Sequence, residues 1–191
     1  MIQATNAKAK LRKRGLHARR NLNDQTRVNA SQVIAEHIVH SHEFMACKTI
    51  ACYLPSCDEV DPSYIIERAW RANKRIFSPV VADRYGMFFR QLLPDTQLEK
   101  SRFDLWEPVS GPRIRANQID VVITPVVAFD DQQNRIGMGG GYFDRCFSFL
   151  RHRQHWLHPK LIGVAFDCQK VEKIPANPWD IRLYSVITEI R

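Results

Sequence analysis

The sequence lacks several features that would define a class of protein at once. Its 191 residues contain no uncharged run of eighteen apolar positions, and the first twenty are basic with no apolar stretch behind them, so neither a membrane span nor a secretory signal is expected. The five cysteines are an odd number and form no C-x-x-C pair, which argues against disulfides and a zinc site. We therefore expect a cytoplasmic protein with reduced thiols.

Acidic residues are almost absent from the first 27 positions. This stretch holds eight basic side chains against the single acid Asp24, so it carries +7 of the formal net charge of +8. The remaining residues are nearly neutral and, at 45% hydrophobic positions overall, have the composition of one globular domain. A basic segment of this kind can grip a polyanion, or it can be the solvated face of a helix.

Hydrophobic patterning and turn residues predict alternating helices and strands. We expect helices over residues 4–20, from a cap at Asp24 through Val39, over 64–71 behind an Asp61 cap and a first-turn Pro62, and over 142–152. Strands are expected over 49–54, 75–82 and 87–93 with a turn at 83–86, then over 119–129, 161–166 and 184–190. Residues 94–118 are expected to form a long connection with short extended pieces. The segment 119–129 is apolar on both faces, as in a buried parallel strand. The fold class is therefore α/β: a single domain with a mostly parallel sheet in a three-layer α/β/α arrangement.

Glycine is scarce except at one place. Four of the eight glycines fall within residues 137–141, between a strand and a helix. Glycine allows backbone N–H groups to turn toward a ligand, and the helix N-terminus adds positive potential, so this loop is expected to bind phosphate. The dinucleotide fingerprint and the Walker A ending are both missing.

Charged residues flank this loop. Arg135 can bind phosphate oxygens, and we expect it to be reachable by solvent, so that its loss affects turnover more than stability. Asp144 can hold Mg²⁺ or simply favour the first turn of a helix. A second acidic cluster, residues 58–61, follows the 49–54 strand and can face the same crevice, where Asp61 can either cap a helix or accept hydrogen bonds from a ligand.

Residues 124–130 and 135–145 (TPVVAFD and RIGMGGGYFDR) together resemble the signature of 5-formyltetrahydrofolate cyclo-ligases, most closely the bacterial branch. Residues 8–12, 58–61 and 171–180 agree with further family segments in the same order, so the resemblance spans nearly the whole chain. It implies conversion of 5-formyltetrahydrofolate, ATP and Mg²⁺ to 5,10-methenyltetrahydrofolate, ADP and phosphate through a phosphorylated formyl intermediate. It further implies a monomer that uses neither nucleic acid nor a membrane.

By the same resemblance, Arg135 is the catalytic residue, Asp144 and Asp180 hold Mg²⁺, and the basic helix 4–20 packs on or over the ATP site. The implied ATP-binding residues are Lys8, Ala9, Lys10, Leu11, Arg12, Arg135, Ile136, Gly137, Met138, Gly139, Gly140, Gly141, Tyr142 and Phe143. The implied substrate-binding residues are Ser56, Glu59, Asp61, Met138 and Tyr142. Two alternatives stay open from the residues themselves: an RNA-binding protein that uses the basic helix, and another phosphometabolite-dependent α/β enzyme.

Overall fold

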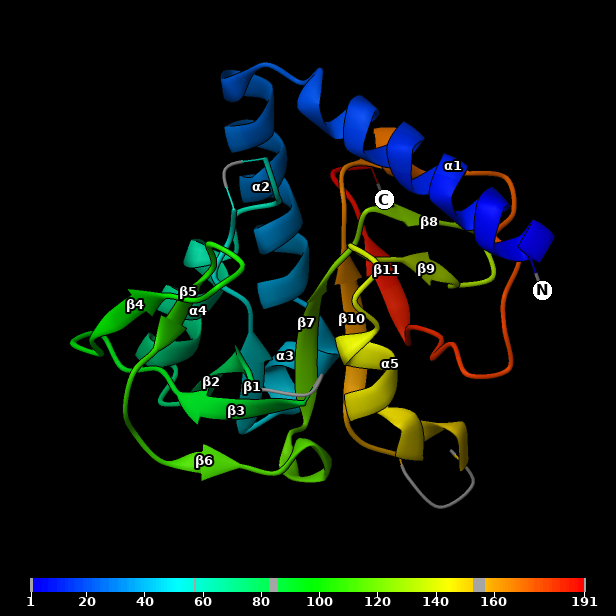
Figure 1. Ribbon diagram of the computed structural model, residues 1–191. Coiled ribbons are helices and arrows are strands. Elements are labelled where there is room, and N and C mark those ends of the chain that lie inside the picture. Colours follow the sequence, from blue (N-terminus) through cyan, green and yellow to red (C-terminus); the bar gives the residue numbers. More distant parts are fainter. Residues whose placement is uncertain (1, 57, 83–85, 153–156, 191) are drawn as a thin grey trace.

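The computed structural model describes residues 2–56, 58–82, 86–152 and 157–190. Its centre is a seven-stranded sheet in the order β11-β10-β7-β1-β2-β3-β6 (Figure 1). These strands are β1 (Thr49–Cys52), β2 (Arg75–Val81), β3 (Met87–Gln91), β6 (Arg113–Ile114), β7 (Val121–Pro125), β10 (Lys160–Val164) and β11 (Ser185–Ile187). From β11 through β2 all neighbours are parallel, and β3 and β6 form an antiparallel edge. The predicted mostly parallel sheet is confirmed.

Successive residues of the buried strands alternate between two hydrophobic cores. In β7, Val121 and Ile123 pack with the first set of helices, whereas Val122 packs on the other side with Phe147 and Leu150. The helices of the first side are α2 (Asp24–Val39), α3 (His42–Ala46) and α4 (Ser63–Arg71), and those of the second are α5 (Tyr142–Cys146) and η3 (Ser148–His152). Three layers follow from this alternation, as predicted.

Helix α1 (Ile2–Arg20) lies across a small hairpin formed by β8 (Ala128–Phe129) and β9 (Arg135–Ile136) (Figure 1). At Gly15 the helix comes so close to the main chain that a Cβ would collide with the carbonyl oxygen of Val127. Leu11 adds its side chain to the small cluster that joins the hairpin to the C-terminal part of the chain. Glycine at position 15 therefore sets how closely α1 docks.

The prediction of one strand over residues 119–129 is wrong. The chain leaves the central sheet after Pro125, and β8 begins three positions later, at Ala128. Gln169, in η4 (Asp167–Gln169), is buried and donates its Nε2 to the carbonyl oxygens of Val126 and Val127, each at 2.8 Å. The amide of a residue 42 positions away thus satisfies the backbone of the bend, and the local sequence carries no sign of it.

Other boundaries differ in smaller ways. The expected helix over 142–152 is two short pieces, α5 and η3. Asn23 rather than Asp24 caps α2, because its side-chain oxygen accepts the Thr26 N–H at 2.8 Å. The short extended pieces expected in the 94–118 connection are confirmed: it contributes β6 to the sheet edge and forms β4 (Leu98–Lys100) and β5 (Trp106–Pro108), together with η2 (Ala116–Gln118). Of the predicted turn at 83–86, residues 83–85 lie outside the described part of the chain.

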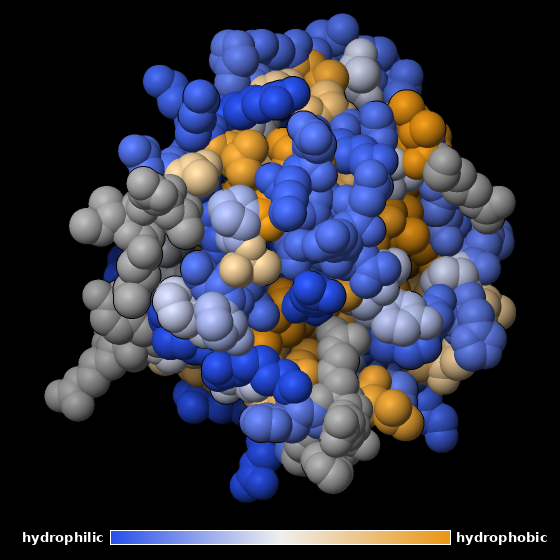
Figure 2. Space-filling view, turned by 90° about the vertical axis from the view of Figure 1, so that its right-hand side faces the viewer, coloured by the Kyte–Doolittle hydropathy of each residue, from blue (hydrophilic) through white to orange (hydrophobic). Residues whose placement is uncertain are grey.

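The remaining expectations concern thiols and membranes. The four described cysteines are free: Cys47, Cys52, Cys146 and Cys168. Cys57 lies outside the described residues. Among the residues that the structure describes, no helix combines the length and the apolar character needed to cross a bilayer. Hydrophilic residues cover most of the face shown in Figure 2, and hydrophobic residues are visible between them in separate small groups.

Candidate functional site

One face of α1 carries the residues that contact the rest of the site. Lys8, Arg12, Gly15 and Arg19 are spaced by four, three and four positions, so they line one side of the helix. Arg12 and Arg19 are seven positions apart, which separates them by about 10 Å along the helix axis at a rise of 1.5 Å per residue. The helix therefore brings cations to two separate loops, the glycine loop 137–141 and the acidic loop 58–61.

Arg12 reaches the glycine loop at residues 137–141. Its Nε donates to the Gly137 carbonyl at 2.7 Å, and its guanidinium carbon lies 3.3 Å from the position that a Cβ on Gly139 would occupy. Gly139 has φ = 103° and Gly141, the N-cap of α5, has φ = 65°. Both values belong to the left-handed region that favours glycine, so the expected need for glycine in this turn is confirmed at two positions.

Two aspartates meet beside this loop. Asp144 Oδ1 accepts the Ile181 N–H at 3.0 Å and the Arg135 Nη2 at 2.8 Å, and Asp180, the neighbour of Ile181, pairs with Lys8. The Arg135 side chain also donates to the Ile181 carbonyl, and only 7% of its surface is exposed. The expectation of a solvent-reachable Arg135 is wrong: its guanidinium holds α5 to the C-terminal segment.

The second loop that α1 reaches is the acidic one. Arg19 is 3% exposed, and its Nη2 lies 2.9 Å from Asp58 and its Nη1 3.7 Å from Glu59. Arg20, on the exposed side, lies 3.2 Å from the same Asp58. Burial alone would raise the pKa of the Asp58 carboxyl, but its hydrogen bonds and ion pairs with both arginines outweigh burial and hold the pKa below its ordinary value. Asp58 therefore stays ionised at neutral pH.

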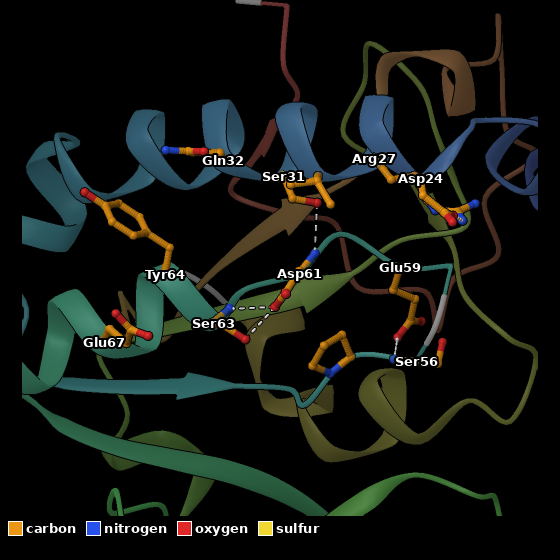
Figure 3. A pocket seen from close by; sticks show the side chains of 12 residues that line it. Asp24, Arg27, Ser31, Gln32, Ser56, Glu59, Asp61, Ser63, Tyr64 and Glu67 are labelled. Carbon is orange, nitrogen blue, oxygen red and sulfur yellow. Dashed lines mark hydrogen bonds and ion pairs between the residues drawn. The ribbon is translucent and has the colours of Figure 1, made fainter.

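A cavity of about 620 Å³ opens on the other side of the acidic loop, a size typical of small-molecule sites (Figure 3). Three of the predicted substrate-binding residues line it: Ser56, Glu59 and Asp61. The other lining residues come from α2, α4 and the loop before α4: Asp24, Arg27, Val28, Ser31, Gln32, Pro55, Ser63, Tyr64 and Glu67. The lining contains four carboxylates but a single arginine, Arg27, which pairs with Asp24. Such a lining favours a ligand rich in N–H donors.

The two carboxylates expected to meet substrate are bound differently. Glu59 uses one oxygen for the Ser56 N–H at 3.0 Å and turns the other toward Arg19. Asp61 uses Oδ1 for the N–H and hydroxyl of Ser63, at 2.9 and 2.6 Å, which partly confirms the capping alternative although Pro62 occupies the cap position. Asp61 Oδ2 forms no hydrogen bond with the described residues. Asp61 is thus the better acceptor for a ligand.

The predicted substrate residues fall into two groups. Met138 lies on the glycine loop and Tyr142 is the first residue of α5, and both are outside the lining of the cavity. Tyr142 packs edge to face against Phe103, with ring centroids 5.9 Å apart. Sequence reasoning assigned no role to Phe103, because it lies in the connection 94–118, where no periodicity marks it.

The predicted ATP segment at residues 8–12 divides in the same way. Lys8 and Arg12 face the site, Leu11 packs into the hairpin cluster, and Ala9 and Lys10 are exposed. In the second ATP segment, Ile136 is buried in the same cluster, and Phe143 packs against Phe147 in the core on the α5 side. Of the predicted ATP-binding residues in these two segments, Lys8 and Arg12 therefore face the glycine loop and its neighbour Asp180, whereas Leu11, Ile136 and Phe143 pack in apolar clusters.

A divalent cation fits this site only with help from a ligand. Within the described residues, no group of three or more His, Cys, Asp or Glu could hold a metal. Asp144 accepts the backbone N–H of Ile181, the residue after Asp180, and the side chains of both aspartates are partly exposed. Mg²⁺ is commonly held by one or two carboxylates together with substrate phosphates, and this pair suits that mode.

Fold and site together define a three-layer α/β protein in which a cationic helix joins a glycine loop to an acidic cavity. The 5-formyltetrahydrofolate cyclo-ligase family model matches residues 4–189, and the chain belongs to this family. The resemblance inferred from the motifs is confirmed.

Relatives of known name and structure agree. The chain is 35% identical to the 5-formyltetrahydrofolate cyclo-ligase of Escherichia coli K12, over 89% of this chain and 93% of that one. It is 33% identical to the enzyme of that name from Haemophilus influenzae, over 88% and 90%. The solved structure of Aquifex aeolicus 5,10-methenyltetrahydrofolate synthetase superposes with a TM-score of 0.82 at 30% identity, over 96% and 90%. These matches support the enzyme interpretation rather than the RNA-binding alternative.

Proposed function

We propose that this chain catalyses the ATP-dependent conversion of 5-formyltetrahydrofolate to 5,10-methenyltetrahydrofolate, with release of ADP and phosphate. Family membership supports the reaction, and the names of the relatives identify the substrate and product. The observation that carries the proposal is the reach of α1, which brings Arg12 to the glycine loop and Arg19 to the loop beside the cavity. The same proposal has the chain acting as a monomer on two small molecules, without nucleic acid or a membrane.

ATP would lie against the glycine loop. Backbone amides in left-handed turns and the cations Lys8 and Arg12 are suited to a triphosphate. Mg²⁺, held by Asp144 and Asp180 together with phosphate oxygens, would supply neutralisation of the phosphate charge. Arg135 would orient Asp144 rather than bind phosphate directly, because its own donors already face Asp144 and Ile181.

The folate would enter the cavity with its pterin ring toward Asp61. The ring offers several N–H donors, and Asp61 Oδ2 is an acceptor without a partner among the described residues. The glutamate end of the folate is anionic and is repelled by the four carboxylates of the lining, so it would point outward.

The chemistry asks the protein for alignment more than for a reacting side chain. The formyl oxygen attacks the γ-phosphorus and ADP leaves; the folate N10 then attacks the activated carbon, a proton is released and phosphate leaves. Holding both reactants in the reactive orientation lowers the activation free energy by about 7–11 kcal/mol in favourable cases. Charge that develops on the transferred phosphoryl group would be stabilised by the loop amides and by Lys8 and Arg12.

A spectroscopic assay tests the function directly. Purified protein is mixed with 5-formyltetrahydrofolate, ATP and Mg²⁺, and the near-ultraviolet absorbance of the methenyl product is followed. Product that forms only with all three components supports the proposal, and ADP should appear in equal amount. Absence of product, or product that forms without ATP, would contradict it. Asp61→Asn is the sharpest variant, because it should raise KM for the folate and leave KM for ATP unchanged.

A further inference from the structure

Asp130 is a buried carboxylate that the proposed chemistry does not use. It is 2% exposed and lies at the turn between β8 and β9. Oδ1 accepts the N–H groups of Gln132 and Asn134, each at 3.0 Å. Oδ2 accepts the Asn134 side-chain amide at 3.0 Å and the Ile174 N–H at 2.8 Å. Both oxygens are thus occupied by N–H donors, which is how a buried carboxylate is tolerated.

The two oxygens hold two different parts of the chain. Oδ1 closes the turn 130–134, which leads directly into Arg135 and the glycine loop. Oδ2 reaches 44 positions along the sequence to Ile174, where the segment carrying Asp180 begins. That segment is held again at its far end, because Leu183 N–H donates to the Gln133 carbonyl at 3.0 Å. The turn 130–134 therefore forms hydrogen bonds with both ends of the Asp180 segment, residues 174–183.

Apolar packing differs between the two ends of this segment. At the far end, Ile181 and Leu183 are buried in the core on the α5 side. At the Ile174 end, the cluster is small and, within the described part of the chain, consists of Ala128, Ile136, Val171 and Ile174, with Leu11 packed against them. A cluster of this size leaves sliding motions of the segment weakly opposed, whereas hydrogen bonds to a fixed carboxylate specify one register. The approach of the Asp180 segment to the glycine loop at its Ile174 end thus depends mainly on the polar contacts at the turn, of which the bond to Asp130 is one.

We propose that Asp130 is a positioning residue for ATP: it fixes the segment that carries Asp180 against the glycine loop, and so sets the geometry of the nucleotide half of the site. This inference rests on the proposed function. An amide at position 130 can still accept on one side, but its NH₂ would face the Ile174 N–H and the Asn134 amide, donor against donor. The segment is then released at one end while the chain keeps its volume and fold.

Asp120 offers a matched control. Its Oδ2 accepts two backbone N–H groups, of Lys48 and Thr49, each at 2.9 Å, just before the opposite end of β7. Asp120→Asn makes the same chemical change far from the glycine loop. For Asp130→Asn we expect kcat/KM for ATP to fall about 100-fold, the cost of a displacement of about 1 Å, while KM for the folate changes less than about twofold. Asp120→Asn should lower the melting temperature without altering either value. An Asp130→Asn variant with an unchanged KM and kcat for ATP would overturn the proposal.

A charge swap separates positioning from support of the turn. In Asp130→Asn combined with Asn134→Asp, the new amide at position 130 can donate to the new carboxylate at 134, which restores the turn but not the bond to Ile174. The melting temperature should recover, while the affinity for MgATP, measured by calorimetry without folate, should stay low. Recovery of both together would show that Asp130 supports only the hairpin, and would overturn the proposal.

Hydrogen exchange in the unaltered protein gives a test that does not depend on a variant folding. Binding of MgATP should slow exchange of the Ile174 and Ile181 amides about tenfold more than that of the Lys48 and Thr49 amides. Equal slowing at all four would overturn the inference. A protein that binds MgATP as described but forms no methenyl product would contradict the proposed reaction and leave the positioning role standing, so the two failures are distinguishable.

Discussion

Replacing Arg19 by glutamine should unfold the protein much more readily than the same change at Arg20. Both arginines pair with Asp58, but the Arg19 side chain is 3% exposed and the Arg20 side chain 65%. Removing the buried partner leaves Asp58 and Glu59 without their main counter-charge in a largely dry position, which costs about 3–5 kcal/mol. The exposed pair is screened by water and contributes about 0–1 kcal/mol. Against a typical total stability of about 5–15 kcal/mol, the first loss is severe and the second is small.

Urea denaturation at several pH values measures both differences. Because the folded-state pKa of Asp58 lies below its unfolded value of about 3.9, the pairing contributes stability that is fully present above the unfolded pKa and is lost as the pH falls through the folded pKa. The difference in the free energy of unfolding between the parent protein and Arg19→Gln should therefore be largest near pH 7 and should disappear as the pH falls below about 4. Adding Asp58→Asn to Arg19→Gln should recover part of the loss, since it removes the abandoned charge.

Two results would refute this reasoning. Equal losses for Arg19→Gln and Arg20→Gln would show that burial does not decide the strength of the pair. A difference in the free energy of unfolding that does not change with pH would show that packing of the long Arg19 side chain, rather than its charge, stabilises the loop. In the same variants, KM for the folate should rise with the loss at Arg19 only, because Glu59 lies between that arginine and the cavity.

Three further changes probe the other half of the site. Gly15→Ala should lower the melting temperature, although alanine is the better helix former by about 1 kcal/mol, because the added methyl group collides with the Val127 carbonyl; an increase would contradict the close docking of α1. Arg135→Ala should reduce both turnover and stability, since the buried guanidinium joins Asp144 to Ile181; turnover lost at an unchanged melting temperature would contradict its structural role. Asp144→Asn should shift the Mg²⁺ titration at fixed ATP to higher metal concentration, and an unchanged curve would exclude it as a ligand.

The sequence was informative wherever a local pattern reflects a local cause. A segment that is apolar on both faces predicted a sheet covered on both sides, and clustered glycines predicted a turn with positive φ, because both effects act between near neighbours in the chain. The bend after Pro125 could not be predicted in this way. Its carbonyl groups are satisfied by Gln169, and only the folded chain brings that amide to them.

The candidate site shows the same division. The glycine loop and its charged neighbours were recognisable from residue type and spacing, but the partners of those charges were not. Arg135 was expected to be reachable by solvent, but its side chain is 7% exposed because it pairs with Asp144, nine positions further along the chain. Arg19 was counted only as part of a basic stretch. Its spacing of seven residues from Arg12 was the available signal, because that spacing places two residues on one face of a helix.

The pairing of these charges bears on how ATP would bind. Lys8 neutralises Asp180 and Arg135 neutralises Asp144, so the four groups carry no net charge together. Under the proposed function, phosphates would draw Lys8 toward themselves while the accompanying cation takes the place of Lys8 beside Asp180, so that each charge exchanges one partner for another. No carboxylate or cation is then left unpaired at any stage, which avoids the penalty of an isolated charge in a partly buried site. Under this proposal, metal and nucleotide would bind together, because either one alone would leave without a partner the charge that the other neutralises.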